Sequence, residues 1–262
     1  MPVKFRTQTS ANRSPSISEI FSPALWYDAS DSSTVTLSGG TVSTWANKGS
    51  AGTGYNLTQA TASSQPSYSA TQNGLKVMTF DGSDDQMFCT QLNTVTHIFV
   101  ASAWSAAGAS STNYKGFLSS NSYDWHGPNS TALASGSFAA AWVTSQPTQS
   151  TSQLDGSNFV NVSNNKWTTF SIYSINLQSG YTGGFNGTGY GNGSDRIFVG
   201  NYGEIIAYQT TYLTAAQIET VTGYLAWKWG STSLLPSSFT YKSQSPFLQS
   251  TYYPVKFSGK TI

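Results

Sequence analysis

The segment 214–230, TAAQIETVTGYLAWKWG, carries the most complete set of structural signals in the sequence. Thr214 is placed to act as an N-cap, and Gln217 three residues later completes a capping box. Apolar side chains then recur at helical spacing on one narrow stripe, and Gly230 supplies a stop signal. We therefore predict one amphipathic helix here, preceded by two short strands within 196–213.

Two aromatic residues of this helix lie off the apolar stripe. Tyr224 lies beside the stripe and Trp227 lies roughly opposite it, so the helix needs cover on two sides. We expect one face to pack on a β core and the other to be covered by the chain's own tail. The alternative is cover by a neighbouring polypeptide. In that case the partner-binding residues would be Tyr224, Trp227, Phe247, Tyr252 and Tyr253.

The rest of the chain is typical of an all-β protein. Short runs of β-branched and aromatic residues alternate with turns rich in Gly, Ser and Asn. We expect strands at 23–28, 34–37, 41–45, 75–80, 95–104, 116–119, 138–143, 158–162, 167–176, 184–185 and 196–199. Their length and spacing favour a two-sheet antiparallel sandwich. The predicted organisation is an N-terminal arm at 1–22, a sandwich at 23–230 and a C-terminal tail at 231–262.

The charge pattern excludes several classes of partner. Charged residues make up 9% of the chain, against about 25% in ordinary domains. The net charge is +1 without a Lys/Arg cluster, which argues against nucleic-acid binding. No apolar run is long enough for a membrane span, and the N-terminal residues lack the pattern of a signal peptide. A surface so poor in charge favours a protein that is partly covered in an assembly.

Three pieces of sequence together resemble one known family. They are SPALWYDASDSSTVTLSGGTVSTWANKGS from residue 22, NGLKVMTFDGSDDQMF from residue 73, and GEIIAYQTTYLTAAQIETVTGYLAWKWG ending at residue 230. In this order they resemble laminin-G-like modules of the concanavalin A-like superfamily. The resemblance implies a jelly-roll sandwich whose last strand runs into a short helix. Such modules occur in secreted bacterial proteins, in phage fibres and in virion proteins of large viruses.

No catalytic residues are predicted. Hydrolysis of sugars on this kind of sandwich needs two neighbouring carboxyl groups. The glutamates Glu19, Glu204 and Glu219 are widely separated, and the E-x-D-x-x-E signature of the superfamily's hydrolases is absent. A hydrolase would require a carboxylate pair that meets only in space. We therefore expect a protein that is not an enzyme.

No cofactor or metal is predicted either. Asp81 to Asp85 (DGSDD) could offer oxygen ligands to calcium, but Asp and Gly closing a β-turn explain the same residues. His97, within the apolar run TVTHIFV, is interpreted as a strand histidine rather than a ligand. The Gly-rich run 181–194 lacks the lysine of a phosphate-binding loop and is interpreted as a hairpin or loop tip.

A loop rich in aromatic residues is the candidate ligand site. Flat rings with hydrogen-bonding groups at their edges suit a sugar-binding surface, although packing under a loop explains the same residues. The candidate glycan-binding residues are Trp104, Tyr123, Trp125, His126 and Trp142.

The leading expectation is a non-enzymatic structural or surface-decoration protein of a large assembly, such as a viral capsid or tail. Its partners would be other virion proteins, its location the virion surface, and homo-oligomers are compatible with it. The alternative is a carbohydrate-binding module that recognises cell-surface glycans. An extracellular location without a recognisable signal peptide would fit that alternative.

Overall fold

The structure is a computed structural model that describes residues 19–110, 116–120, 124–126, 150–158, 166–177, 179, 183–189 and 197–247. The strands are β1 (Leu25–Asp28), β2 (Val35–Ser38), β3 (Thr41–Trp45), β4 (Leu57–Thr58), β5 (Thr71–Gln72), β6 (Leu75–Lys76), β7 (Met78–Asp81), β8 (Met87–Trp104), β9 (Gly116–Ser119), β10 (Asp124–His126), β11 (Ser150–Leu154), β12 (Ser157–Asn158), β13 (Ser171–Leu177), β14 (Gly183–Thr188) and β15 (Val199–Gln209). The helices are α1 (Ala106–Ser110) and α2 (Ala215–Trp229), with single-turn 3-10 helices at Ser32–Thr34, Thr53–Tyr55, Ala62–Ser64 and Thr232–Leu234. No helix in these ranges is long and apolar enough to cross a membrane.

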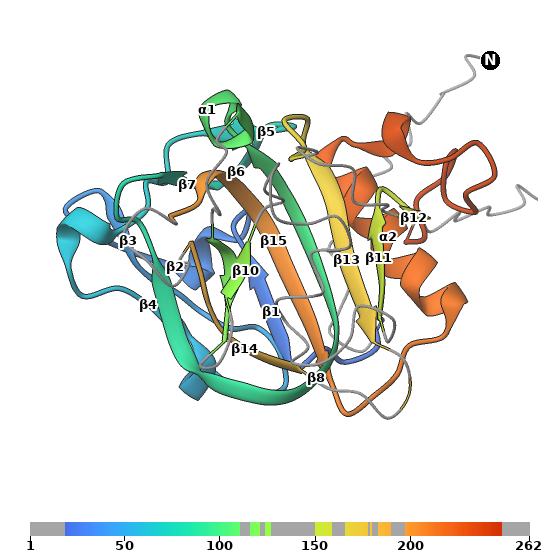
Figure 1. The fold of residues 1–262 in the computed structure, drawn as a ribbon, viewed down its shortest axis with the longest axis horizontal. Coiled ribbons are helices and arrows are strands. Elements are labelled where there is room, and N and C mark those ends of the chain that lie inside the picture. Colours follow the sequence, from blue (N-terminus) through green and yellow to red (C-terminus); the bar gives the residue numbers. More distant parts are fainter. Residues whose placement is uncertain are drawn as a thin grey trace, which may run out of the picture.

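The fold is a strand-rich, curled antiparallel sheet that is compatible with a β-sandwich (Figure 1). The long strand β8 lies at its centre and pairs with β4, β13, β14 and β15. Thr94, in the middle of β8, has a φ of 59°, and the pairing of β8 with β14 and with β15 shifts register nearby. Such irregularities bend a strand. One strand therefore contributes to both halves of the curled sheet.

The two halves of β8 differ in burial because only the second half has an apolar cluster packed on each face. From Val95 to Trp104 every residue is buried, whereas exposed and half-buried positions occur between Met87 and Thr94. The buried half has an apolar cluster on each face. One cluster fills the inside of the curled sheet, and the other lies between the sheet and α2. A strand covered on both faces reads as a continuous apolar run, which explains the sequence TVTHIFVASAW.

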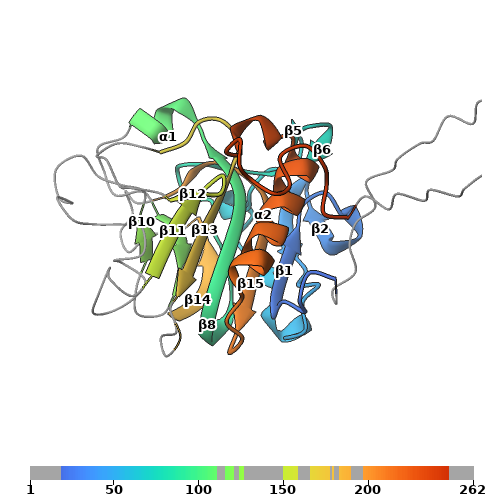
Figure 2. The same ribbon diagram turned by 90° about the vertical axis from the view of Figure 1, so that its right-hand side faces the viewer.

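The helix α2 begins and ends as the sequence predicts. Thr214 and Gln217 form the capping box, and Gly230 closes the helix with a left-handed φ of 76°. Figure 2 shows α2 lying over one face of the sheet and running roughly along β1, β15 and β8. The hairpin of β5 and β6 completes its C-terminal end, because Gln72 Nε2 and Asn73 Nδ2 donate to the carbonyl oxygens of Trp229 and Lys228 at 3.0 and 2.9 Å. These amides satisfy carbonyl groups that a helix end leaves unpaired.

The chain's own tail covers the second face of α2, which confirms the prediction that this cover comes from within the chain. Trp227 Nε1 donates to the carbonyl oxygen of Tyr241 at 2.8 Å, and Gly223 leaves room for the ring of the same tyrosine. Phe247 meets the Tyr224 ring edge-on at 5.7 Å between centroids. Lys242 holds this part of the tail against the residues that follow α2, because its ammonium group donates to three carbonyl oxygens, those of Thr232, Ser233 and Leu235.

Several predicted elements have different bounds in the structure. The two strands expected within 196–213 are one strand, β15, and 75–80 is divided between β6 and β7. The predicted central strand 95–104 begins eight residues earlier, as β8. Part of the Gly-rich run is not a loop tip, because 183–188 forms β14 and pairs with β8 and β9. The predicted strand 138–143 lies outside the described residues.

We predict that Gly49→Ala destabilises the fold while Gly54→Ala does not. A Cβ at Gly49 would lie 2.2 Å from the carbonyl oxygen of Ala24, whereas a Cβ at Gly54 meets nothing within 4 Å. Backbone cannot move aside as a flexible side chain can, so we expect a loss of about 1–3 kcal/mol in the free energy of unfolding. Urea denaturation of both variants measures the difference. Equal midpoints for the two variants would contradict the close approach of these segments.

Candidate functional site

A buried cluster of charges beneath α2 is the most unusual feature of the described structure. It joins Asp28 of β1, Glu204 of β15 and Lys228 of α2, with Lys48 at its edge. Asp28 and Glu204 lie directly opposite each other in the antiparallel pair β1–β15. They are 1% and 0% exposed, although ionised side chains are almost never fully buried unless they are paired. The hydrolase alternative required a carboxylate pair that meets in space, and this pair does.

Four donors surround the carboxylate of Glu204. Oε1 accepts from Trp26 Nε1 at 2.6 Å and from the Tyr224 hydroxyl at 2.9 Å. Oε2 accepts from Trp229 Nε1 at 3.0 Å and lies 2.7 Å from Lys228 Nζ. Each oxygen therefore has two donors, which satisfies the whole accepting capacity of an ionised carboxylate.

Asp28 is held by two lysines and a serine. Oδ1 lies 2.7 Å from Lys228 Nζ and accepts from the backbone and the hydroxyl of Ser30. Oδ2 lies 3.2 Å from Lys48 Nζ, which also pairs with Asp31 at 2.8 Å. The ion pairs therefore run from the buried Glu204 outward to Asp31 at the surface.

Burial and charge act in opposite directions on the two carboxyl groups. Burial tends to raise the pKa of Asp28, but the neighbouring ammonium groups of Lys228 and Lys48 outweigh it and the pKa lies below its usual value. Burial dominates at Glu204 and raises its pKa, against the opposing effect of Lys228. Since every partner of Glu204 is a donor, the ionised form is the one that this environment satisfies.

The arrangement suits a structural tie better than catalysis. A general acid or nucleophile must reach a substrate, whereas both carboxylates are buried and that of Glu204 is bonded to the indole N–H groups of Trp26 and Trp229. Lys228 supplies one positive charge to both carboxylates from the helix side, and Lys48 supplies a second to Asp28. What the cluster does is link β1, the loop after β3, β15 and α2 through charge-assisted hydrogen bonds.

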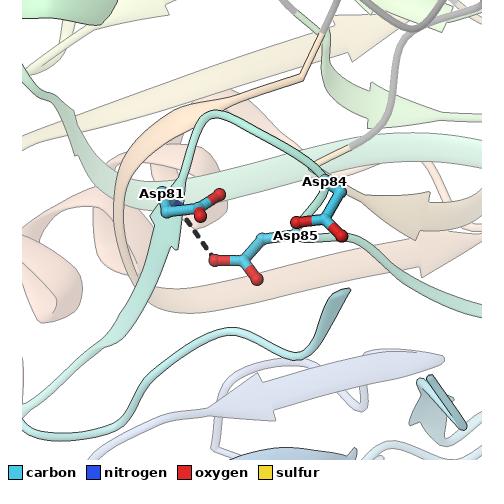
Figure 3. A group of neighbouring side chains, drawn as sticks. All are labelled: Asp81, Asp84 and Asp85. Atoms are coloured by element: carbon cyan, nitrogen blue, oxygen red, sulfur yellow. Dashed lines mark hydrogen bonds between the residues drawn. The ribbon is translucent and has the colours of Figure 1, made fainter. Parts of the chain in front are cut away.

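The aspartate turn is the one group of possible metal ligands that the described residues contain (Figure 3). Carboxylate oxygens of Asp81, Asp84 and Asp85 lie within 4.8 Å of one another. One oxygen of each carboxylate accepts a hydrogen bond within the fold: Asp85 accepts from the backbone of Asp81 at 2.8 Å and Asp84 from Ser64 Oγ at 3.1 Å. Asp81 accepts from the backbone of Ser83. These contacts are those of Asp residues closing a turn, the interpretation preferred from the sequence.

Of the predicted glycan-binding residues, Trp104 is the one whose side chain the structure describes. Trp104 lies in the core, 2% exposed and stacked on Phe117, so its ring presents no face to solvent. Trp125 and His126 lie in β10, whose backbone pairs with β9. Tyr123 and Trp142 lie outside the described residues. Glycan binding therefore stays a prediction.

Of the predicted partner-binding residues, some lie within the described structure and are covered by the chain itself, and the others lie outside it. Tyr224 is 4% exposed and bonds to Glu204, and the tail covers Trp227. Phe247 is half-buried against the α2 cluster. Tyr252 and Tyr253 lie outside the described residues. In this chain the aromatic face of α2 is thus occupied internally, and partner binding through these residues stays a prediction.

Asp155 is a further buried carboxyl group, at the turn between β11 and β12. It is 6% exposed, and its Oδ1 accepts from the backbone N–H of Ile172 at 2.7 Å. Burial raises the pKa of Asp155 to about 6, against the effect of this hydrogen bond. Its φ of 49° is left-handed, a conformation that Asn also tolerates.

Comparisons with protein-family models, with curated proteins and with solved structures find no match to this chain. The laminin-G-like resemblance therefore stays a prediction that rests on the sequence pieces that carry it.

Sequence reasoning missed the charge cluster, although signals for it exist. Asp28, Glu204 and Lys228 each interrupt an apolar run, in LWYDA, GEIIAY and AWKWG. In a chain with so few charges, a charge within an apolar run indicates a buried ion. The pieces of sequence that carry the family resemblance also supply the cluster, since Lys48 comes from TWANKGS.

We predict that Lys228→Met destabilises the protein much more than Lys76→Met. The first change leaves two buried carboxylates without their shared cation, which typically costs about 3–5 kcal/mol. The second removes an exposed lysine that contacts Ser69 and Tyr68, and should stay within about 0.5 kcal/mol. Chemical denaturation of both variants measures the effects. Similar small losses in both would show that Lys228 does not hold the cluster.

We predict that Asp155→Asn stabilises the protein above pH 6 and has little effect below pH 3.8. The folded pKa of about 6 lies above the ordinary 3.8, so the folded state favours the protonated form. Stability is therefore lost as the pH rises through this window, and an amide avoids that loss while keeping the acceptor for Ile172. The expected gain at neutral pH is about 1–3 kcal/mol. Denaturation curves of wild type and Asp155→Asn between pH 3 and pH 7 measure the difference in the free energy of unfolding. A difference that did not depend on pH would contradict the prediction.

Proposed function

We propose that this chain is a concanavalin A-like sandwich module that acts as a non-enzymatic structural or surface-decoration component of a large assembly, such as a viral capsid or tail. One observation carries most weight. The described residues nearest to both terminal segments are anchored in the same layer of the fold. Ile20 and Phe21 at one end and Phe247 at the other all belong to the apolar cluster around α2.

The anchoring of the first described residues is tight. Ile20 is fully buried, and its carbonyl oxygen accepts from the Tyr208 hydroxyl at 2.6 Å. Phe21 and Ser22 then turn the chain into β1 with φ values of 65° and 51°. The described part of the chain therefore begins and ends in the same apolar cluster around α2. Chain ends held in one layer are suited to attach the module on that side, leaving its other surfaces free for display.

The distribution of charge supports the same function. Several of the few charged residues are used inside the fold, by the cluster of Asp28, Glu204 and Lys228. The surface strand β2 carries uncharged exposed side chains, among them Leu37 at 49% exposed. Such a surface is poorly protected against association and suits a protein that is partly covered by its neighbours.

The test is amine cross-linking of purified virus particles from cells that produce the chain. Lys4 in the first segment and Lys256 and Lys260 in the last are expected to cross-link to other polypeptides of the particle. Lys76, exposed on the domain, is the internal reference. Deleting 1–18 and 248–262 should abolish incorporation while the melting temperature stays within a few degrees, because Ile20, Phe21 and Phe247 remain. Finding the chain in cell lysates but never in particles contradicts the proposal, as does full incorporation of the deletion variant.

A further inference from the structure

At the N-terminal end of α2, opposite the charge cluster, lies a second buried polar site centred on His97. The side chain is 2% exposed, and a backbone hydrogen bond joins its ring to Thr211. The other ring nitrogen, Nδ1, is buried without a hydrogen-bond partner in the described structure. The site therefore accommodates a neutral imidazole whose Nδ1 carries no proton.

The groups around the ring are neutral. Tyr208 from β15 and Tyr212 from the segment before α2 meet it edge-on, at 6.5 and 6.2 Å between centroids. Asn176 of β13 lies directly opposite His97 in the strand pair, so the two side chains share one face of the sheet. The Asn176 Oδ1 is also buried and unpaired. Burial lowers the pKa of His97 to about 4, and no neighbouring charge contributes to that shift.

The ring lies beneath the short connection 210–214 between β15 and α2. Thr210 donates from its backbone to Thr94, and Thr96 Oγ1 donates to the carbonyl oxygen of Thr211 at 2.5 Å. This connection ends at Thr214, the N-cap residue of α2. His97 and Thr96 both attach Thr211 to the sheet, and Leu213 is buried in the apolar cluster around α2.

We propose that His97 is an acid-sensitive latch: protonation of its ring releases the connection 210–214 and the first turn of α2 from the sheet. A protonated ring is a buried charge without a counter-ion, which is costly even beside a neutral acceptor such as the Asn176 amide oxygen, and opening this connection gives the ring access to water. The sign follows from linkage. Because the folded-state pKa is lowered from 6.5 to about 4, protons bind the opened form better, and the latch weakens as pH falls through that window.

The test is an NMR titration of the full chain. The sequence has two histidines, so His97→Gln assigns the Cε1–H signal of His97. We expect this signal to titrate near pH 4, and the amides of 210–216 to open increasingly as the pH falls from 6.5 to about 4. Their opening constant, from hydrogen exchange corrected for intrinsic rates, should rise by roughly tenfold per pH unit between the two pKa values.

Two matched variants separate the latch from simple loosening. Thr96→Val removes a bond to Thr211 without touching the ring, so opening should increase while its dependence on pH stays. Asn176→Asp places a carboxylate opposite Nδ1, so protonation should no longer open the connection. In His97→Gln the pH dependence should vanish. A His97 signal that titrates near 6.5, or amides that open identically in wild type and His97→Gln, would overturn the proposal. The wild-type titration decides even if a variant fails to fold.

Discussion

The shared ion pair of Lys228 with Asp28 and Glu204 is the interaction on which the position of α2 depends. Removing these groups from water is costly, and the cost is offset only when each charge meets its partners in good geometry. Apolar packing alone would tolerate small shifts of the helix along the sheet. A shift that left either carboxylate unpaired would not be tolerated, so we infer that the cluster selects one position for the helix.

The layers of the fold follow from that position. Because α2 packs on the sheet, the second half of β8 is covered on both faces. The C-terminal tail then packs against the aromatic residues on the other face of α2. The interface between α2 and the sheet is polar at both ends, but in different ways. At the C-terminal end of the helix the carboxylate of Glu204 is fully paired, whereas at the N-terminal end His97 keeps an unpaired nitrogen. The first end is therefore suited to hold the helix and the second to respond to protons.

Local signals predicted the elements that local physics decides. The capping box of Thr214 and Gln217 and the left-handed Gly230 depend on neighbouring residues, and each has the predicted place. The strand bounds were less accurate. Before Val95, β8 is a partly exposed strand in which polar side chains such as Gln91 and Asn93 interrupt the apolar pattern. Trp104 was assigned to a glycan surface because composition cannot tell a stacked core ring from an exposed one.

The sequence by itself determined the class of fold, the helix with both its ends, and the need for cover on two sides of that helix, because spacing along the chain encodes which side chains share a face. Only the tertiary structure decided what provides the cover and where the charges lie. Asp28, Lys48, Glu204 and Lys228 are separated by up to 200 residues and form one cluster only because β1 pairs with β15 beneath α2. No local pattern encodes that pairing, since it depends on the free energy of the whole sheet.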